Sequence, residues 1–154
     1  MLTPRNVIYG FCLFTNPQKP KYLISLYRGF DLEIIACFTT SQERAGVPQA
    51  QIKHGKMINY RGDIVSYVFE AGRIVGQKPD GTPFSFPKRT FIPFDYCFQS
   101  KSQEELIKGF KDPAICFVLN EEEYIEILYA MYKSDLTPEK YKPIFNGILE
   151  KICQ

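Results

Sequence analysis

Segments with strand character come before segments with helix character along this 154-residue chain. Apolar runs rich in β-branched and aromatic residues, separated by turn-forming residues, predict strands over residues 6–15, 21–27, 32–40, 64–69, 73–76 and 90–94. Helical signals gather after residue 100. Because this order lacks alternating βαβ units, it predicts an α+β fold, with a small, strongly curved antiparallel sheet and C-terminal helices packed on it. We expect one domain over residues 1–154, strand-rich over 1–99 and helical over 100–154.

Three helix starts are predicted from capping patterns in the last third. Ser102 has a glutamate three residues further on, Asn120 is followed at the same spacing by Glu123, and Thr137 precedes a proline. The glutamates that begin the second of these helices are interpreted as a solvated face near the positive end of the helix dipole. The apolar segment 114–119 is either a last strand or an apolar extension.

Charge and cysteine usage indicate the cellular setting. Net charge is only +2, but residues 1–77 hold nine basic and five acidic residues while 78–154 hold ten and twelve, so a polyanion site is expected in the first half. The five cysteines include no C-x-x-C pair, which favours free thiols in a reducing cytoplasm. No apolar run approaches the roughly 20 residues of a membrane span. We therefore expect a cytoplasmic protein with no membrane partner.

The motifs give no support for nucleotide-cofactor or metal chemistry. The chain contains no G-x-G-x-x-G, Walker or G-x-S-x-G pattern, and His54 is its single histidine. One histidine cannot form a two-histidine acid/base pair or a multi-histidine metal site. His54 could act as a general base, but its neighbours Lys53 and Lys56 favour a solvated loop residue. The expectation is a protein with no metal and no cofactor.

The stretch from Lys19 to Gln42 carries the most suggestive chemistry. If its two strands pair as a hairpin about residues 28–31, Lys21 near the start of one strand faces Thr40 near the end of the other. A cation beside the hydroxyls of Thr40 and Ser41 can stabilise a phosphodiester during cleavage, and in RNA the neighbouring 2′-OH can be the nucleophile. The alternative is that these hydroxyls only end a strand and begin a turn.

The same stretch, KPKYLISLYRGFDLEIIACFTTSQ, resembles the MazF/PemK (Kid-like) toxins, whose pattern is a basic residue and a proline, a hydrophobic strand, a hairpin, and a second strand ending in Thr-Ser or Thr-Thr. The resemblance implies an SH3-like barrel with appended helices, a homodimer, and a metal-independent endoribonuclease that cuts single-stranded RNA and is blocked by an antitoxin protein. It places Lys21 or Lys19 where the family has its catalytic arginine, and Thr40 or Ser41 where the family has its hydroxyl residue. Ser25 matches the serine that ends the first hairpin strand.

A second basic element runs from Phe84 to Phe91, where cations and aromatic residues interleave as in grooves that bind single-stranded nucleic acid. The competing interpretation places Phe84 and Phe86 in the core. The polar segment 41–63 is expected to be an exposed basic loop with little regular structure. Together these elements give the predicted RNA-binding set: Lys19, Arg44, Lys53, His54, Lys56, Lys88 and Arg89.

Three functions remain open on this sequence. The first is a toxin-like endoribonuclease with Lys21, Thr40 and Ser41 as catalytic residues. The second is a noncatalytic SH3-like module that binds nucleic acid or a protein partner. The third is an assembly subunit whose helices form an interface. The endoribonuclease is preferred, because it alone accounts for the cation, the hairpin and the hydroxyl cluster together.

Overall fold

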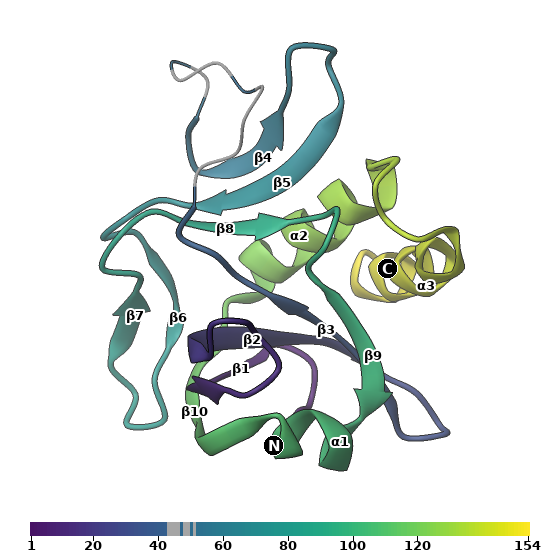
Figure 1. Ribbon diagram of the computed structural model, residues 1–154. Helices are drawn as coiled ribbons and strands as arrows, with labels where there is room; N and C mark the ends of the chain where they lie inside the picture. The colour runs from purple at the N-terminus through teal and green to yellow at the C-terminus, as the bar shows by residue number, and fades with distance from the viewer. Residues whose placement is uncertain (43–46, 48–49, 51) are drawn as a thin grey trace.

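A computed structural model describes residues 1–42, 47, 50 and 52–154 (Figure 1). The strands and helices are β1 (Asn6–Cys12), β2 (Lys19–Arg28), β3 (Glu33–Phe38), β4 (Gly55–Ile58), β5 (Ile64–Phe69), β6 (Ile74–Gln77), β7 (Pro83–Ser85), β8 (Thr90–Pro93), β9 (Phe98–Ser102), α1 (Gln103–Lys108), β10 (Phe110–Leu119), α2 (Glu121–Lys133), a 3-10 turn (Glu139–Tyr141) and α3 (Lys142–Ile152). The predicted α+β class is confirmed.

The strands form two antiparallel sheets. The larger has seven strands in the order β7-β6-β10-β1-β2-β3-β9, and the smaller has three in the order β4-β5-β8. Within the described residues the larger sheet has two open ends, at β7 and β9, and does not close into a ring. The SH3-like barrel is therefore not confirmed, while an antiparallel sheet carrying helices is.

Strands β2 and β3 pair as a hairpin, as the sequence predicts. Its strands pair Leu23 with Phe38 and Arg28 with Ile34. Alternate side chains enter two separate cores: Ile24 and Leu26 belong to the main core, while Leu23 belongs to a second core on the opposite face. Burial of both faces explains why the hairpin sequence is an unbroken apolar run instead of an alternating one.

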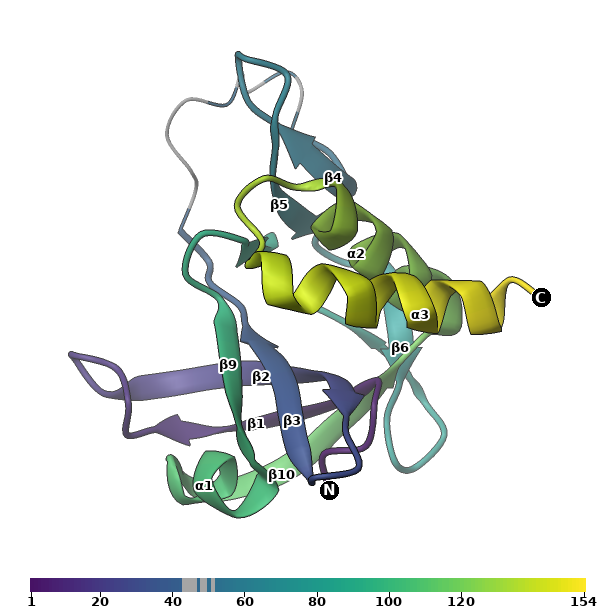
Figure 2. The same cartoon turned by 90° about the vertical axis from the view of Figure 1, so that its right-hand side faces the viewer.

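The two faces of the larger sheet are covered by different elements (Figure 2). The main core lies between this sheet, the smaller sheet and the helices α2 and α3, to which Tyr124, Ile127 and Phe145 contribute. The second core is closed by α1 through Leu106 and by the N-terminal Leu2. No described helix is long and apolar enough to cross a membrane, and all five cysteines have free thiols.

The last third is less helical than predicted. The ten-residue strand β10 lies between β1 and β6 in the larger sheet, so the apolar segment 114–119 is a strand and the region 100–154 is not purely helical. The Asp112-Pro113 pair, which signals a turn in the sequence, lies inside β10. Asp112 has φ +53°, and the pairing with β1 shifts register between Tyr9 and Phe11. A bulge thus absorbs the turn-forming residues without ending the strand.

Two of the three predicted helix starts agree with the structure. Ser102 caps α1, its Oγ accepting a hydrogen bond from the Glu105 N–H at 3.2 Å, and α2 follows Asn120. The third start is wrong, because α3 begins only at Lys142, after the 3-10 turn. The Thr137 hydroxyl is buried and has no hydrogen-bond partner among the described residues, so it caps neither element.

The segment predicted as an irregular loop, 41–63, contains strand β4. Among the described residues, one backbone bridge joins the smaller sheet, which β4 begins, to the end of β3 in the larger one. Thr40, just beyond β3, and Phe91 in β8 exchange two backbone hydrogen bonds, each 2.8 Å long. Strand β8, which contains Pro93, is an outer strand of the smaller sheet, a position that suits a residue without a backbone N–H. Thr40 therefore sits where the two sheets meet.

Candidate functional site

An open cleft of about 350 Å³ lies at this junction of the sheets. Residues from β1, from β2, from the end of β3 and from the connection between β7 and β8 form its wall. They are Tyr9, Lys19, Pro20, Lys21, Tyr22, Thr39, Thr40, Ser41, Phe86, Pro87, Lys88 and Thr90, and we call this site the basic cleft. The structure thus brings the three predicted catalytic residues together with two of the predicted RNA-binding lysines.

Lys21 is held in place by the strand that faces it. The pairing of β2 with β3 reaches Leu23 and Phe38, and just beyond it the Lys21 ammonium donates a hydrogen bond to the Thr39 carbonyl oxygen at 2.8 Å. Burial lowers the pKa of Lys21, and the positive charge of Lys19 lowers it further. An anion in the cleft would relieve this repulsion.

The two hydroxyl residues differ in how they face solvent. Thr40 is only 7% exposed, and its Oγ1 accepts a hydrogen bond from the Gln42 N–H at 3.2 Å. This bond uses one lone pair, so the Thr40 O–H remains able to donate. Ser41 is exposed at the cleft wall. The two interpretations of these hydroxyls are therefore compatible: the residues begin a turn after β3, and both line the cleft.

Aromatic rings also line the cleft, and two of them, Tyr9 and Tyr22, are not among the site residues predicted from the sequence. Tyr9 and Tyr22 lie in tilted contact with ring centroids 4.4 Å apart, and Tyr22 packs edge-on against Phe86 at 5.0 Å. Burial, with smaller contributions from Cys116 and Tyr9, raises the pKa of Tyr22 to about 12, so its phenol stays neutral and able to donate at neutral pH. The sequence signal that could have identified Tyr9 as a site residue is its position in a predicted strand, where alternate side chains face opposite sides.

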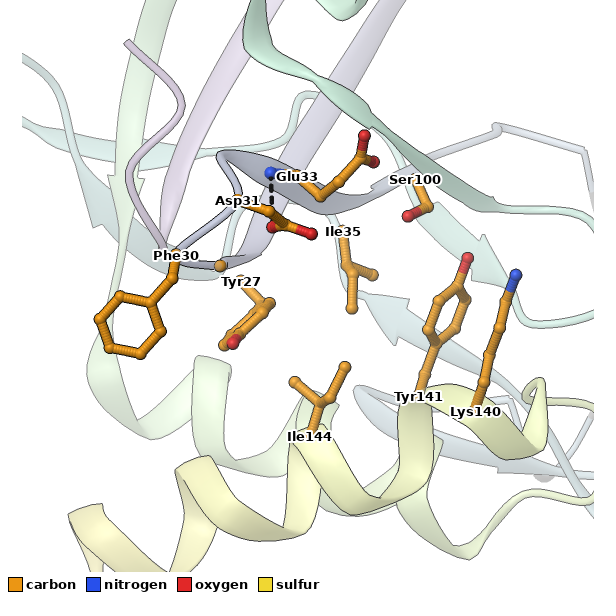
Figure 3. A pocket seen from close by; sticks show the side chains of 10 residues that line it. Tyr27, Phe30, Asp31, Glu33, Ile35, Ser100, Lys140, Tyr141 and Ile144 are labelled. Carbon is orange, nitrogen blue, oxygen red and sulfur yellow. Dashed lines mark hydrogen bonds between the residues drawn. The ribbon is translucent and has the colours of Figure 1, made fainter.

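Charge distinguishes the basic cleft from the other cavities. Three lysines line it, and no carboxylate is among its described lining residues. A cavity of about 550 Å³ between the β2–β3 turn and α3 is instead rimmed by Asp31 and Glu33, with Lys140 across from them (Figure 3). A groove of about 500 Å³ between α2 and α3 carries two lysines and two glutamates. The basic cleft is the cavity among these that suits a polyanion.

His54 lies outside the basic cleft, in a cluster of partnered polar groups. Its Nε2 is 2.7 Å from the Glu123 Oε1, and its Nδ1 accepts from the Glu70 N–H at 3.2 Å. This network assigns the ring proton to Nε2, which donates to the carboxylate. The His54 side chain is 10% exposed, so the prediction of a solvated loop histidine is wrong.

Glu123 is also placed differently from its prediction. Its side chain is 11% exposed, and its Oε1 accepts a second hydrogen bond, from the hydroxyl of buried Tyr67, at 2.7 Å. Burial, and then the negative charge of Glu123, raise the pKa of Tyr67. The interpretation of all the glutamates at this helix start as a solvated face is therefore wrong for Glu123, although Glu121 and Glu122 are exposed.

The remaining predicted RNA-binding residues do not converge on the cleft. Arg89 donates two hydrogen bonds to the Glu70 carboxylate, from Nε at 2.9 Å and Nη2 at 3.1 Å. These bonds lower the pKa of Glu70. Lys56 lines the groove beside α2, and exposed Lys53 is absent from the cleft wall. Arg44 lies outside the described residues. Phe84 and Phe86 are buried, which confirms the core interpretation for both rings.

Comparisons with protein-family models, with curated proteins and with solved structures gave no match to this chain. Among the described residues, the basic cleft is the feature whose geometry and chemistry bear most directly on function.

Proposed function

We propose that this protein binds single-stranded RNA in the basic cleft and cleaves it without a metal ion, as a toxin of the MazF/PemK kind. The observation that carries the proposal is that Lys21, Thr40 and Ser41 line one open cleft whose described wall contains no carboxylate. Cations and hydroxyl donors are the groups that stabilise a phosphate whose negative charge increases in the transition state.

The reaction that suits these groups is attack by the 2′-OH of RNA on its own 3′ phosphate. The bond from phosphorus to the new 2′ oxygen forms as the bond to the 5′ oxygen of the next nucleotide breaks. The products are a 2′,3′-cyclic phosphate and a free 5′-OH. The 2′-OH proton leaves to water in the open cleft, and the departing 5′ oxygen takes a proton from water, so no co-reactant is consumed.

Each polar residue of the basic cleft has a role that follows from its position. Lys21 stabilises a nonbridging phosphate oxygen, and Ser41, the more exposed hydroxyl, donates to the other. The Thr40 hydroxyl is held by Gln42 and donates from the floor of the cleft. Lys19 and Lys88 attract the flanking backbone. In this proposal a cognate antitoxin supplies an acidic segment that competes for these lysines, and the protein acts as a homodimer.

The test uses purified protein and a short single-stranded RNA in EDTA. We expect cleavage with 2′,3′-cyclic phosphate ends, and we expect Lys21→Ala to remove it while Lys151→Ala, an exposed lysine at the end of α3, does not. A substrate with one 2′-deoxynucleotide should be bound but left intact at that position. Absence of cleavage by the unmodified protein in EDTA would contradict the proposal.

A noncatalytic RNA-binding module is the second candidate, and one observation favours it. The only histidine of the chain is engaged by Glu123 and Glu70 outside the cleft, so no imidazole is available there for proton transfer. In that case RNA binds with the same dependence on Lys21 and stays intact. Measuring binding and cleavage on the same RNA separates the two candidates.

A further inference from the structure

One face of strand β1 changes from core to surface along its length. Val7, Tyr9 and Phe11 alternate onto the same face, because successive side chains of a strand point to opposite sides. Val7 is fully buried in the main core, whereas Tyr9 is 40% exposed and Phe11 is 38% exposed. Two aromatic rings therefore extend outward from the core along the strand that enters the basic cleft.

The neighbours of these rings are aromatic or basic. In the register of the sheet, Tyr9 lies opposite Tyr22 on β2, and Phe11 lies opposite Pro20. On the other side, Phe11 lies opposite Lys111 of β10. Tyr9 is also among the residues that line the basic cleft, so the aromatic strip reaches that cleft. Exposed rings beside cations match the chemistry of an RNA base next to its phosphate.

The spacing of the rings favours a single strand. Side chains two residues apart on an antiparallel strand are separated by about 6.8 Å, from a rise of about 3.4 Å per residue. This is about twice the 3.4 Å repeat along one strand of a duplex. Consecutive bases that remain stacked on each other cannot both cover these rings, whereas bases splayed apart in a single strand can.

We propose that Tyr9 and Phe11 form a stacking platform for two consecutive unpaired bases of the RNA whose phosphate occupies the basic cleft. The inference rests on the proposed function, because it names the register in which that RNA lies. It predicts that single-stranded RNA is preferred over a duplex of the same sequence. The platform accepts any base, since every base has a face on which a ring can stack.

The first experiment uses the unmodified protein, so it does not depend on any variant folding. Two RNAs, which carry a single 5-iodouracil at one or the other of two adjacent positions, are irradiated in complex with the protein, and the adducts are mapped by mass spectrometry. We expect adducts on Tyr9 and on Phe11 from adjacent nucleotides. Adducts on Tyr60, which is 74% exposed elsewhere on the surface, with none on β1 would overturn the inference.

The second experiment measures RNA affinity for substituted proteins. Tyr9→Leu and Phe11→Leu should each weaken binding by about tenfold, as loss of one base–ring stack does, while Tyr9→Phe should keep it. Tyr60→Leu and Phe30→Leu are the matched controls at other exposed rings. Unchanged affinity in both β1 variants, with RNA still bound, refutes the platform and leaves the proposed function intact. If the unmodified protein binds no RNA, the proposed function itself fails.

A second copy of this chain is the competing occupant of the strip. In that case Tyr9→Leu and Phe11→Leu convert a dimer to a monomer in analytical ultracentrifugation and leave the RNA affinity per protomer unchanged. That outcome also overturns the inference. A loss of RNA affinity in Tyr9→Leu that is absent in both Tyr9→Phe and Tyr60→Leu supports it.

Discussion

The basic cleft differs from a second polar region in whether its cations lie beside carboxylates. We call this second region the cluster, and it is formed by His54, Tyr67, Glu70, Arg89 and Glu123. The described residues that line the cleft include three lysines and hydroxyl groups but no carboxylate. In the cluster, Arg89 is bound to Glu70, and His54 to Glu123. Both regions contain basic residues that are predicted from the sequence to bind RNA. The difference shows that a cation indicates a ligand site only where the fold leaves it without a carboxylate.

The comparison also separates stability from function. Groups whose partners lie within the chain contribute to the folded state, and their removal leaves a buried group without a partner. Groups whose charge faces a water-filled cleft contribute little to folding, so they are available to a ligand. Substitutions in the cluster should therefore lower stability, whereas substitutions in the basic cleft should lower ligand binding or cleavage and leave stability little changed.

The largest expected effect is on cleavage by Lys21→Ala. Removing one donor to a developing phosphate charge typically costs about 10²–10³-fold in rate. We expect a loss of this size in single-turnover RNA cleavage, with the thermal midpoint of unfolding little changed. Lys21→Arg should retain a measurable rate, because the guanidinium keeps the charge. A large fall in stability for Lys21→Ala would place this lysine with the structural cluster and break the contrast.

The next effect is on stability, at Glu123. Glu123→Ala removes the acceptor of two short hydrogen bonds and leaves the buried Tyr67 hydroxyl and the His54 ring without it. Each unsatisfied buried group costs about 1–3 kcal/mol, so we expect a loss of about 3 kcal/mol in urea unfolding. Glu122→Ala is the control, since that side chain is exposed one residue earlier in the same helix. Equal stability of the two variants would contradict the assignment of Glu123 to the core.

The hairpin and its chemistry could be predicted from the sequence because both depend on local order. The turn at residues 28–31 makes the two strands pair as a hairpin, which brings the start of β2 and the end of β3 together at its open end. A bulge between Ser25 and Tyr27 shifts the register by one residue, so the turn alone does not set the exact partner of Lys21. Burial of alternate residues in two cores could likewise be expected from the unbroken apolar run. These features need no knowledge of distant segments.

Two of the errors concern contacts between distant segments. His54 has lysines as near neighbours in the sequence, and its partner Glu123 comes from helix α2. The sequence predicts a turn at Asp112, but this residue lies inside strand β10, where a bulge against β1 accommodates it. Local propensity describes a residue's neighbours along the chain, whereas burial and pairing depend on elements brought together by folding.

A smaller effect concerns pH. Because burial and Lys19 lower the pKa of Lys21, this lysine loses its proton below the ordinary value of 10.5. The protonated form binds phosphate, so affinity for an uncleavable 2′-deoxy oligonucleotide should fall as pH rises, with a midpoint below 10.5. Lys19→Gln should weaken binding and raise this midpoint, because the repelling charge is gone. A midpoint that does not move in Lys19→Gln would show that the two ammonium groups do not interact.

The smallest effect compares two adjacent cations by salt dependence. Lys88 lines the cleft, whereas Arg89 is bound to Glu70. Each cation that contacts phosphate contributes about −0.7 to the slope of log affinity against log salt for a single strand. Lys88→Gln should therefore make the slope shallower by about 0.7, and Arg89→Gln should leave it unchanged while costing less than about 1 kcal/mol of stability, since the Arg89–Glu70 pair is partly exposed. Equal slope changes in the two variants would mean that Arg89 leaves Glu70 to bind RNA. The chain's own carboxylate would then be a competitor for the ligand, and Glu70→Gln should tighten RNA binding.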